Sequence, residues 1–471
     1  MLAVFYDVLH GLQSVLQGGS MIVLICGMGI YLTVRTRFFQ IRGFSFIWRN
    51  TIGTLLKKDD KRSARGISPF QAVNTALAGT MGVGNIAGVA TALTLGGAGA
   101  IFWMWISSFF GMMTKYAEIV LAVRYRERAE DGGWLGGPMY YMEKGLGKRW
   151  MGKLFALLCA AGSFGIGNMT QVNAVSGAAK AAFGIPFWIS GLVTAAIVAL
   201  VIFGGVRRIA SVAEIVIPFI SIAYIAACAF AIMRGSDYLA GAAVLIFEQA
   251  FTLRSAAGGV AGYGLLTALR YGVSRGVFTN EAGIGSASIA HAAADCKSPA
   301  HQGAWGIFEV FLDTNTVCTL TGLVLLTANG GALWKSGLDG VEMTTAAFVS
   351  VFGSLGATFI AVSVVIYAIA GMLGWCLYGE TSVGYLTNRS ERSILFYRAF
   401  FILCVFVGAV SELRMVWELT DALNALMAIP NIASLWLLRG EISLPGTPAR
   451  HKSIPPRKRP GRNTNRGDRL I

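Results

Sequence analysis

Charged residues are scarce in this chain, in which 13% of the 471 residues are charged and 55% are hydrophobic. Soluble domains carry roughly 25% charged residues, so the composition excludes an ordinary soluble protein. The formal net charge of +15 would suggest nucleic-acid binding in a soluble protein. Here the basic residues fall in short loops and in the tail, without interleaved aromatic residues, so membrane topology explains them better. The sequence therefore predicts an integral membrane protein that binds no nucleic acid.

Catalytic and metal-binding signatures are lacking as well. The sequence has no Gly-x-Ser-x-Gly elbow, no phosphate-binding loop ending in Lys-Ser or Lys-Thr, and no HExxH pair, so we expect neither an enzyme nor an ATP-driven step. The seven cysteines form no CxxC pair and few histidines lie near them, which argues against zinc. We expect no cofactor, with Na⁺ only as a coupling ion. A signal peptide is also lacking, so the first apolar stretch is expected to be retained.

Long apolar stretches, by contrast, dominate the chain. About eleven of them approach the roughly 20 residues that a membrane helix needs. They cover approximately residues 12–34, 69–95, 100–123, 154–182, 186–203, 213–233, 258–292, 303–326, 357–377, 394–410 and 416–438.

Basic loops set the expected orientation. They cover residues 35–65 and 124–153, and Arg207 and Arg208 mark a third. The positive-inside rule places these loops in the cytoplasm, with the N-terminus outside and the C-terminus inside the cell (inner) membrane. The alternation gives a leading helix and two sets of five helices with opposite orientation. The expected parts are a leading helix with its basic loop (1–66), a first repeat (67–235), a second repeat (236–440) and a disordered basic tail (441–471).

Glycine is plentiful, with 59 residues, and it interrupts two of the apolar stretches. These are NTALAGTMGVGNIAGVATAL (74–93) and GVFTNEAGIGSASIA (276–290). Each glycine costs about 1 kcal/mol in a helix interior relative to alanine, so both helices are expected to open. Lipid cannot satisfy the freed backbone groups, so each opening has to face a protein-lined cavity. Paired interrupted spans in the two halves of a chain indicate the site of a transporter.

The first opening offers groups for both a carboxylate and a cation. Freed N–H groups at the positive end of a half-helix attract a carboxylate, and the candidates are Val83, Gly84 and Asn85. Carbonyls freed on the other side suit sodium, and the candidates are Ala78 and Met81. Thr80 and the Asn85 amide, which also lie at the break, can bind an ion or a polar solute.

The second opening carries a carboxylate, Glu281, directly after Phe278, Thr279 and Asn280. An ionisable group at mid-bilayer is expensive and is a functional hypothesis by default. Glu281 could pair with a substrate ammonium, hold a proton, or bind Arg275 or Asn280 structurally. Phe278 could close the cavity or simply pack against its neighbours.

Further polar and aromatic residues are candidates elsewhere. Gln171 and Asn173 lie two positions apart, so they face different sides of a helix and only one is expected to reach the cavity. We favour Gln171 as the residue that does so. The alternative role for Gln171 is a helix–helix hydrogen bond. Trp375 could wall the site or anchor at a membrane interface.

Two pairs of charged residues have the spacing of helix neighbours. Lys115 and Glu118, three apart, predict an ion pair on a helix surface. Glu309 and Asp313, four apart, share a helix face and could belong to a gating or a structural network.

Several motifs resemble one family. GNIAGVATA, GGPMYYMEKGLG, FTNEAGIGSASIAHAAA, QGAWGIFEVFLDT, LGWCLYGE and DALNALMAIPN run across nearly the whole span-containing chain. At these residues the sequence resembles the alanine or glycine:cation symporter family. The resemblance implies a leucine-transporter-like fold and secondary uptake of small amino acids driven by sodium or protons. It supports Val83, Gly84 and Asn85 at the substrate carboxylate. It also implies roles in the pocket for Gln171, Phe278, Thr279, Ile284 and Trp375.

The sequence departs from the family pattern where a sodium ligand is expected. The usual Thr-Thr pair before the tryptophan of GW is Ala370 and Gly371 here, and the usual threonine in the first break is Val83. Three alternatives follow: a protonatable Glu281, a sodium site rebuilt with Ser363, or uncoupled uptake. Ala370 and Gly371 also remove bulk, so a somewhat larger substrate would fit.

We therefore predict an all-α polytopic membrane protein with about eleven transmembrane helices. Its fold is a 5+5 inverted repeat with two broken helices. The predicted function is uptake of a small neutral amino acid, alanine or glycine, by symport with Na⁺ or H⁺ and alternating access. The alternatives are an amino-acid sensor derived from a transporter or an uncoupled carrier. A channel is disfavoured, because the breaks meet at mid-membrane and no continuous polar stripe is visible.

Overall fold

The computed structural model of the chain describes residues 19–55, 66–129, 132–252, 264–411 and 413–446. The expected helix start at residues 12–18, residues 56–65 of the basic loop, the segment 258–263 and the tail from residue 447 lie outside these ranges.

A leading helix and three short helices come first. The leading helix is α2 (Gly19–Arg35), and it is followed by α3 (Phe39–Arg42), α4 (Phe44–Asn50) and α5 (Ile52–Leu55). α2 packs mainly against α8, and it also contacts α22 and α15.

The first set of five spans follows. Its elements are α6 (Pro69–Thr80), η1 (Val83–Asn85), α7 (Ala87–Gly96), α8 (Gly99–Arg124), β1 (Glu127–Arg128), β2 (Trp134–Leu135), α9 (Pro138–Lys144), α10 (Arg149–Phe164), η2 (Gly165–Met169), α11 (Thr170–Phe183), α12 (Phe187–Ile202) and α13 (Gly205–Arg234). β1 and β2 form a short antiparallel hairpin.

The second set has the same order of spans. Its elements are η3 (Ser236–Tyr238), α14 (Leu239–Phe251), α15 (Leu265–Asn280), α16 (Ser288–Ala292), α17 (Pro299–Val310), η4 (Phe311–Cys318), α18 (Thr319–Thr327), η5 (Ala328–Gly331), η6 (Leu333–Lys335), α19 (Gly340–Phe352), α20 (Ser354–Leu386), α21 (Glu391–Val410), α22 (Leu413–Leu437) and η7 (Arg439–Glu441). The predicted fold class, with one leading helix and two sets of five spans, is confirmed. The exact division at residues 66, 235 and 440 stays a prediction.

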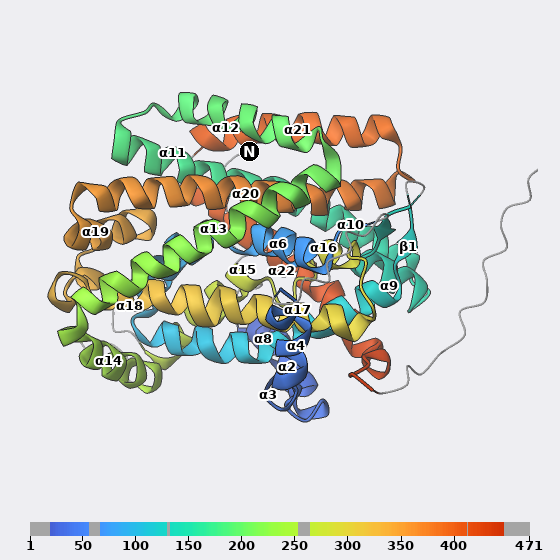
Figure 1. Cartoon of the computed structure of the whole chain (residues 1–471), viewed down its shortest axis with the longest axis horizontal. Helices are drawn as coiled ribbons and strands as arrows, with labels where there is room; N and C mark the ends of the chain where they lie inside the picture. The colour runs from blue at the N-terminus through green and yellow to red at the C-terminus, as the bar shows by residue number, and fades with distance from the viewer. Residues whose placement is uncertain (1–18, 56–65, 130–131, 253–263, 412, 447–471) are drawn as a thin grey trace, which may run out of the picture.

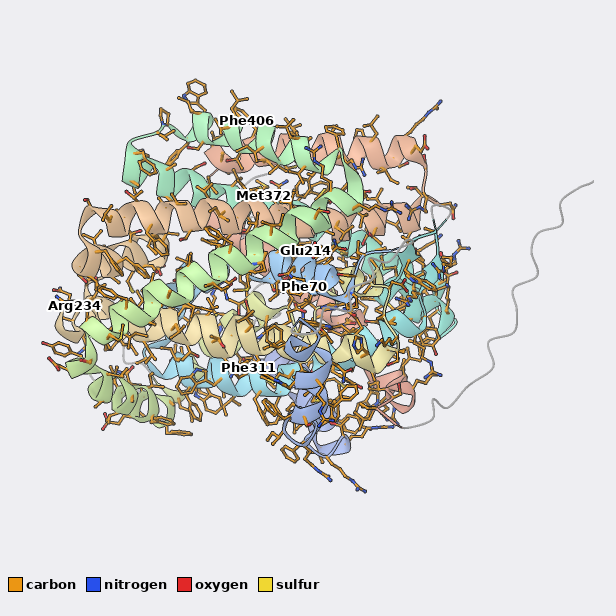
Figure 2. The ribbon with its side chains drawn as sticks, viewed as in Figure 1. Phe70, Glu214, Arg234, Phe311, Met372 and Phe406 are labelled. Atoms are coloured by element: carbon orange, nitrogen blue, oxygen red, sulfur yellow. The ribbon has the colours of Figure 1, made fainter. Side chains whose placement is uncertain are left out.

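Burial separates a central scaffold from lipid-facing helices. In the described ranges, six helical segments are long and apolar enough to cross a membrane. The apolar window of α8 is 83% buried and that of α20 is 78% buried, whereas those of α13 and α21 are 33% buried. α13 and α21 expose large apolar side chains, among them Ile215, Phe219 and Phe396. These surfaces fit contact with acyl chains, and Figure 2 shows Phe406 of α21 near the upper edge of the molecule.

The two broken helices lie in the middle of the molecule. In Figure 1, α6, α15 and α16 occupy the centre, between α13 and α20 on one side and α8 and α17 on the other. The side chain of Gln71 donates to the Glu214 carboxylate at 2.9 Å, which fixes the start of α6 to α13. Figure 2 shows Glu214 close to Phe70 at this contact. The scaffold therefore surrounds both openings with protein and not with lipid.

Both predicted helix openings are present. α6 starts at a capping box formed by Ser68 and Gln71 and ends at Thr80. Gly82 is extended, with φ −121° and ψ −152°. α15 ends at Asn280, and Glu281, Gly283 and Gly285 follow with φ of 54°, 96° and 91°. Left-handed backbone at three positions within five residues explains why this span cannot continue as a helix.

Two further irregularities were not expected from the sequence. The span from α10 to α11 contains the π-helical turn η2, and the span from α17 to α18 contains the π-helical turn η4. π-helical turns widen a helix locally and frequently lie at functional sites. η4 contacts η1 of the first break directly, whereas η2 is joined to it through α11, which continues from η2 and contacts η1.

Candidate functional site

The first break frees backbone groups as predicted. The N–H of Gly82 donates to the Thr80 carbonyl at 2.9 Å, so it no longer reaches the Ala78 carbonyl that it would bond in a continuous helix. The N–H of Asn85 donates to the Gly82 carbonyl and similarly leaves Met81. The predicted cation candidates, the carbonyls of Ala78 and Met81, have therefore lost their helical partners.

Gln171 reaches the first break, and Asn173 does not. The Val83 N–H donates to Gln171 Oε1 at 3.2 Å. The Asn173 amide instead donates to the carbonyls of Gly408 and Ser411, at 3.1 Å and 2.8 Å, and joins α11 to α21. Of the pair, Gln171 therefore contacts the first break, as the spacing of the two positions allows for only one of them. That Gln171 lines a substrate cavity stays a prediction.

Asn85 turns its side chain toward the widened turn η4. Its Nδ2 donates to Asp313 Oδ1 at 2.7 Å and to the Asp313 carbonyl at 3.3 Å. The same nitrogen lies 3.3 Å from Cys318 Sγ. Asn85 Oδ1 is buried and has no hydrogen-bond partner among the residues described. An oxygen acceptor is thus available next to a buried carboxylate.

Asp313 and Thr314 form a polar link between the two breaks. Thr314 Oγ1 lies 2.8 Å from Asp313 Oδ2 and 3.3 Å from Thr279 Oγ1. Asn280 Nδ2 donates to the same Thr314 oxygen at 3.1 Å. Asn85, from the first break, and Thr279 and Asn280, from the second, therefore meet through η4.

Asp313 is fully buried and has no cationic side chain within ion-pair distance in the described ranges. A buried carboxylate without a countercharge is costly, so it favours a bound cation or a proton. Among the described residues, no three His, Cys, Asp or Glu side chains lie close enough together to hold a metal ion. The oxygen atoms of Asn85, Thr279 and Thr314 suit a hard monovalent cation better than a transition metal.

The two breaks also touch directly. A Cβ placed on Gly84 would lie 3.1 Å from Thr279 Cγ2 and 3.2 Å from the Phe278 ring. Phe278 is 9% exposed, so it packs between the first break and its other neighbours. On its far side, Phe278 and Ile284 share a cavity of about 60 Å³ with Met21 and Ile25 of the leading helix.

Glu281 is bound to its own segment. Ser286 Oγ donates to Glu281 Oε2 at 2.5 Å, and Glu281 is 2% exposed. Of its expected structural partners, Arg275 and Asn280, the second is engaged elsewhere, because Asn280 Oδ1 accepts from the Ala282 N–H at 3.0 Å. In the described ranges Glu281 has no cation within ion-pair distance, so it stays a candidate for a substrate ammonium or a proton.

The interpretation of Lys115 and Glu118 as a surface ion pair is wrong. Both are fully buried, because α8 is covered by α15 on one side and by α17 on another. Glu118 Oε1 accepts from the Gly283 N–H at 2.9 Å and from Asn431 Nδ2 at 2.6 Å. Asn431 also donates to the Gly283 carbonyl at 2.8 Å, so α8 and α22 together hold the second break.

Lys115 instead pairs across helices with Glu309. Lys115 Nζ lies 3.4 Å from Glu309 Oε1, and His291 Nε2 lies 2.8 Å from Glu309 Oε2. Gln302 Nε2 lies 2.8 Å from His291 Nδ1. Glu309 therefore belongs to a structural network that joins α8, α16 and α17, while Asp313, one turn later, faces the first break.

α20 packs against the first broken helix and the π-helical turn η2. Trp375 is fully buried, which rules out an anchor at the membrane interface. Its ring packs on Gly167 of η2, where any Cβ would overlap it, and lies 5.4 Å from the Tyr378 ring. A Cβ on Gly79 would lie 2.6 Å from Tyr378 Oη, so this hydroxyl faces the end of α6.

Several buried polar atoms on α20 have no hydrogen-bond partner in the described part of the protein. They are Trp375 Nε1, Tyr378 Oη, Ser363 Oγ and Tyr367 Oη. A buried polar atom without a hydrogen bond lowers the stability of the protein by about 1–3 kcal/mol, so binding of a polar solute or an ion that contacts such an atom is favoured. By contrast, Thr80 is occupied locally, because its hydroxyl donates to the Ala76 carbonyl at 3.2 Å.

Sequence comparison identifies related proteins. Residues 2–444 match the model of the sodium:alanine symporter family. The chain is 42% identical to the sodium/alanine symporter AgcS of Methanococcus maripaludis, over 93% of this chain and 96% of that protein. It is 40% identical to the probable sodium/glutamine symporter GlnT of Bacillus subtilis, over 90% of this chain and 87% of that protein.

Comparison with solved structures supports the fold. The manganese transporter of Eremococcus coleocola covers 77% of this chain with a TM-score of 0.51 and 15% identity, and 75% of that chain is covered. This similarity confirms a leucine-transporter-like fold and gives no information about the substrate of this chain. The matched proteins are transporters, which confirms the prediction that the chain is not an enzyme.

Proposed function

Because the chain belongs to the sodium:alanine symporter family, we propose that it takes up small neutral amino acids, alanine or glycine, together with Na⁺. A secondary transporter of this fold exposes one central site alternately to the two sides of the membrane. The main observation behind the proposal is that the two helix breaks contact each other. They do so directly at Gly84, and indirectly through Asp313 and Thr314, which hydrogen-bond to residues of both breaks.

The two breaks offer complementary charges for a zwitterion. The N–H groups of Val83, Gly84 and Asn85 are the proposed carboxylate ligands, at the positive end of the half-helix α7. Glu281 is the proposed partner of the substrate ammonium, since it is buried, accepts a hydrogen bond from Ser286 and has no cationic side chain within ion-pair distance among the described residues. Phe278, Thr279, Ile284 and Trp375 are the proposed walls, and they favour a small side chain.

Two positions are proposed for the coupling ion. The first consists of the freed carbonyls of Ala78 and Met81 with the unpartnered Ser363 hydroxyl. The second is the Asp313 carboxylate with Asn85 Oδ1 and Thr279 Oγ1. The second position supplies a negative charge, which a monovalent cation needs at mid-membrane. A proton on Asp313 or Glu281 is the alternative coupling ion.

A somewhat larger substrate is the alternative to alanine and glycine. Ala370 and Gly371 remove bulk from α20, and one relative carries glutamine in its name. An amino-acid sensor or an uncoupled carrier remains the alternative class, because the usual hydroxyl pair of the family is absent at these two positions.

The proposed location is the cell (inner) membrane, with the N-terminus outside and the C-terminal tail in the cytoplasm. Its support is the clustering of basic residues in the loops after the leading helix and after α8.

Uptake into proteoliposomes tests the proposal. The purified protein is reconstituted, and labelled alanine, glycine and glutamine are supplied with an inward gradient of NaCl or of choline chloride at fixed pH. Accumulation that needs the sodium gradient supports symport. Accumulation in choline that follows an imposed pH gradient supports proton coupling. Binding without accumulation in either condition would favour the sensor.

A further inference from the structure

The Gln171 side chain lies flat between two glycines. A Cβ placed on Gly82, at the first break, would lie 3.0 Å from both Gln171 Nε2 and Gln171 Oε1. A Cβ placed on Gly371, on α20, would lie 3.2 Å from Gln171 Cδ and 3.4 Å from its Oε1. The glycines thus leave a slot that the planar amide fills, and Gln171 is 4% exposed within it.

The polar groups of this slot match a carboxylate. At one edge the Val83 N–H donates to Gln171 Oε1 at 3.2 Å. This N–H belongs to the start of η1, where backbone donors freed from the helix favour negative charge. On the other side Gln171 Nε2 lies 3.4 Å from the Ile166 carbonyl of the π-helical turn η2, a weak contact. A carboxylate has the planar shape of an amide and would accept from the Val83 N–H more strongly.

We propose that Gln171 is an internal placeholder for the substrate carboxylate. In this conformation the Gln171 amide oxygen accepts the hydrogen bond of the Val83 N–H. The carboxylate of an arriving amino acid therefore has to displace the Gln171 amide to bind this N–H. The inference rests on the proposed function, and it assigns Gln171 a positioning role that competes with substrate. A plain helix–helix bond, such as that of Asn173 to α21, would leave the Val83 N–H free.

A placeholder role predicts opposite changes in alanine affinity for two variants whose side chains are similar in size to glutamine. Gln171→Met keeps the length of the side chain and removes the amide oxygen, so the slot is no longer occupied and alanine should bind about tenfold more tightly. Gln171→Glu places a permanent carboxylate on the Val83 N–H, so alanine should bind at least about tenfold more weakly.

A direct contact between the Gln171 amide and the substrate predicts the reverse order. Gln171→Met would then lose affinity, while Gln171→Glu would attract the substrate ammonium. A merely structural role would weaken binding in both variants and lower their thermal stability. The control is Asn173→Leu, on the same helix but directed at α21, which should leave the affinity for alanine unchanged.

The experiment is calorimetric titration of alanine into the purified wild type and the three variants in NaCl, with thermal unfolding measured in parallel. Tighter binding by Gln171→Met and weaker binding by Gln171→Glu supports the placeholder. The reverse order, or weaker binding in both, overturns it and leaves the proposed function intact. A wild type that binds none of alanine, glycine and glutamine overturns the proposed function and the placeholder together.

Discussion

Asn85 Nδ2 lies 2.7 Å from Asp313 Oδ1, and this contact joins the first helix break to a π-helical turn that is 228 residues away in the sequence. The opposite oxygen of Asp313 accepts from Thr314, which in turn contacts Thr279 of the second break. One buried carboxylate thus connects the two segments that form the proposed site.

The substitution Asp313→Asn tests the negative charge at this link. It keeps the size of the side chain and removes the charge that a cation needs. We expect the ratio of alanine affinities in NaCl and in choline chloride to fall toward one, measured by calorimetry. An unchanged ratio would show that the coupling ion does not bind at Asp313.

The substitution Ser363→Ala tests the other proposed ion position. The Ser363 hydroxyl is buried and unpartnered among the described residues, so its removal costs little stability. If sodium binds there with the carbonyls of Ala78 and Met81, the half-saturating sodium concentration for uptake should rise about tenfold or more. If sodium binds only at Asp313, that concentration should not change.

The buried pair of Lys115 and Glu309 predicts a stability effect. Lys115→Met leaves Glu309 buried without its ammonium partner, which should cost about 3 kcal/mol or more. Thermal unfolding of the detergent-purified protein measures the loss. The matched control is Lys144→Met, since the pair of Lys144 and Glu127 is partly exposed and should contribute less than about 1 kcal/mol. Equal melting temperatures of the two variants would argue against a structural role for Lys115.

Close packing of Trp375 on Gly167 predicts a steric effect. In Gly167→Ala the added methyl group would overlap the buried indole, and overpacking of this kind costs about 1–3 kcal/mol. Gly177→Ala is the control, because nothing lies within 4 Å of its Cβ position, and there alanine should stabilise the helix by up to about 1 kcal/mol. Both values come from thermal unfolding, and alanine affinity should fall only in the first variant.

The proposed orientation of the chain in the membrane can be tested with reporter proteins fused to the C-terminus. A cytoplasmic tail predicts that a fused green fluorescent protein is fluorescent and that a fused alkaline phosphatase is inactive. An active phosphatase fusion would reverse the proposed topology, while the site geometry would stand.

Local sequence patterns were sufficient to predict the two breaks. Gly82 and Gly283 disfavour a helix, and lipid cannot satisfy the freed backbone groups, so both features point to openings inside the protein. The helical spacing of Gln171 and Asn173 similarly indicated that only one of them can reach the break, although it did not say which. These signals lie within a few residues of one another, so they do not depend on the tertiary arrangement.

The partners of buried charges could not be predicted in the same way. The spacing of Lys115 and Glu118 looks like a surface pair, because nothing local shows that α15 and α17 cover both sides of α8. The role of Asp313 depends on the π-helical turn η4, which directs it to Asn85 and for which no sequence pattern was recognised. The only available signal was an acidic residue in an apolar span, and this signal does not identify the residue to which the carboxylate hydrogen-bonds.

The most direct test of the central claim is an experimental structure of the protein with alanine bound in NaCl. We predict that the alanine carboxylate lies on the N–H groups of Val83, Gly84 and Asn85, with its ammonium toward Glu281 and Gln171 moved off Val83. Alanine bound elsewhere, or bound while Gln171 still occupies the Val83 N–H, would contradict the account.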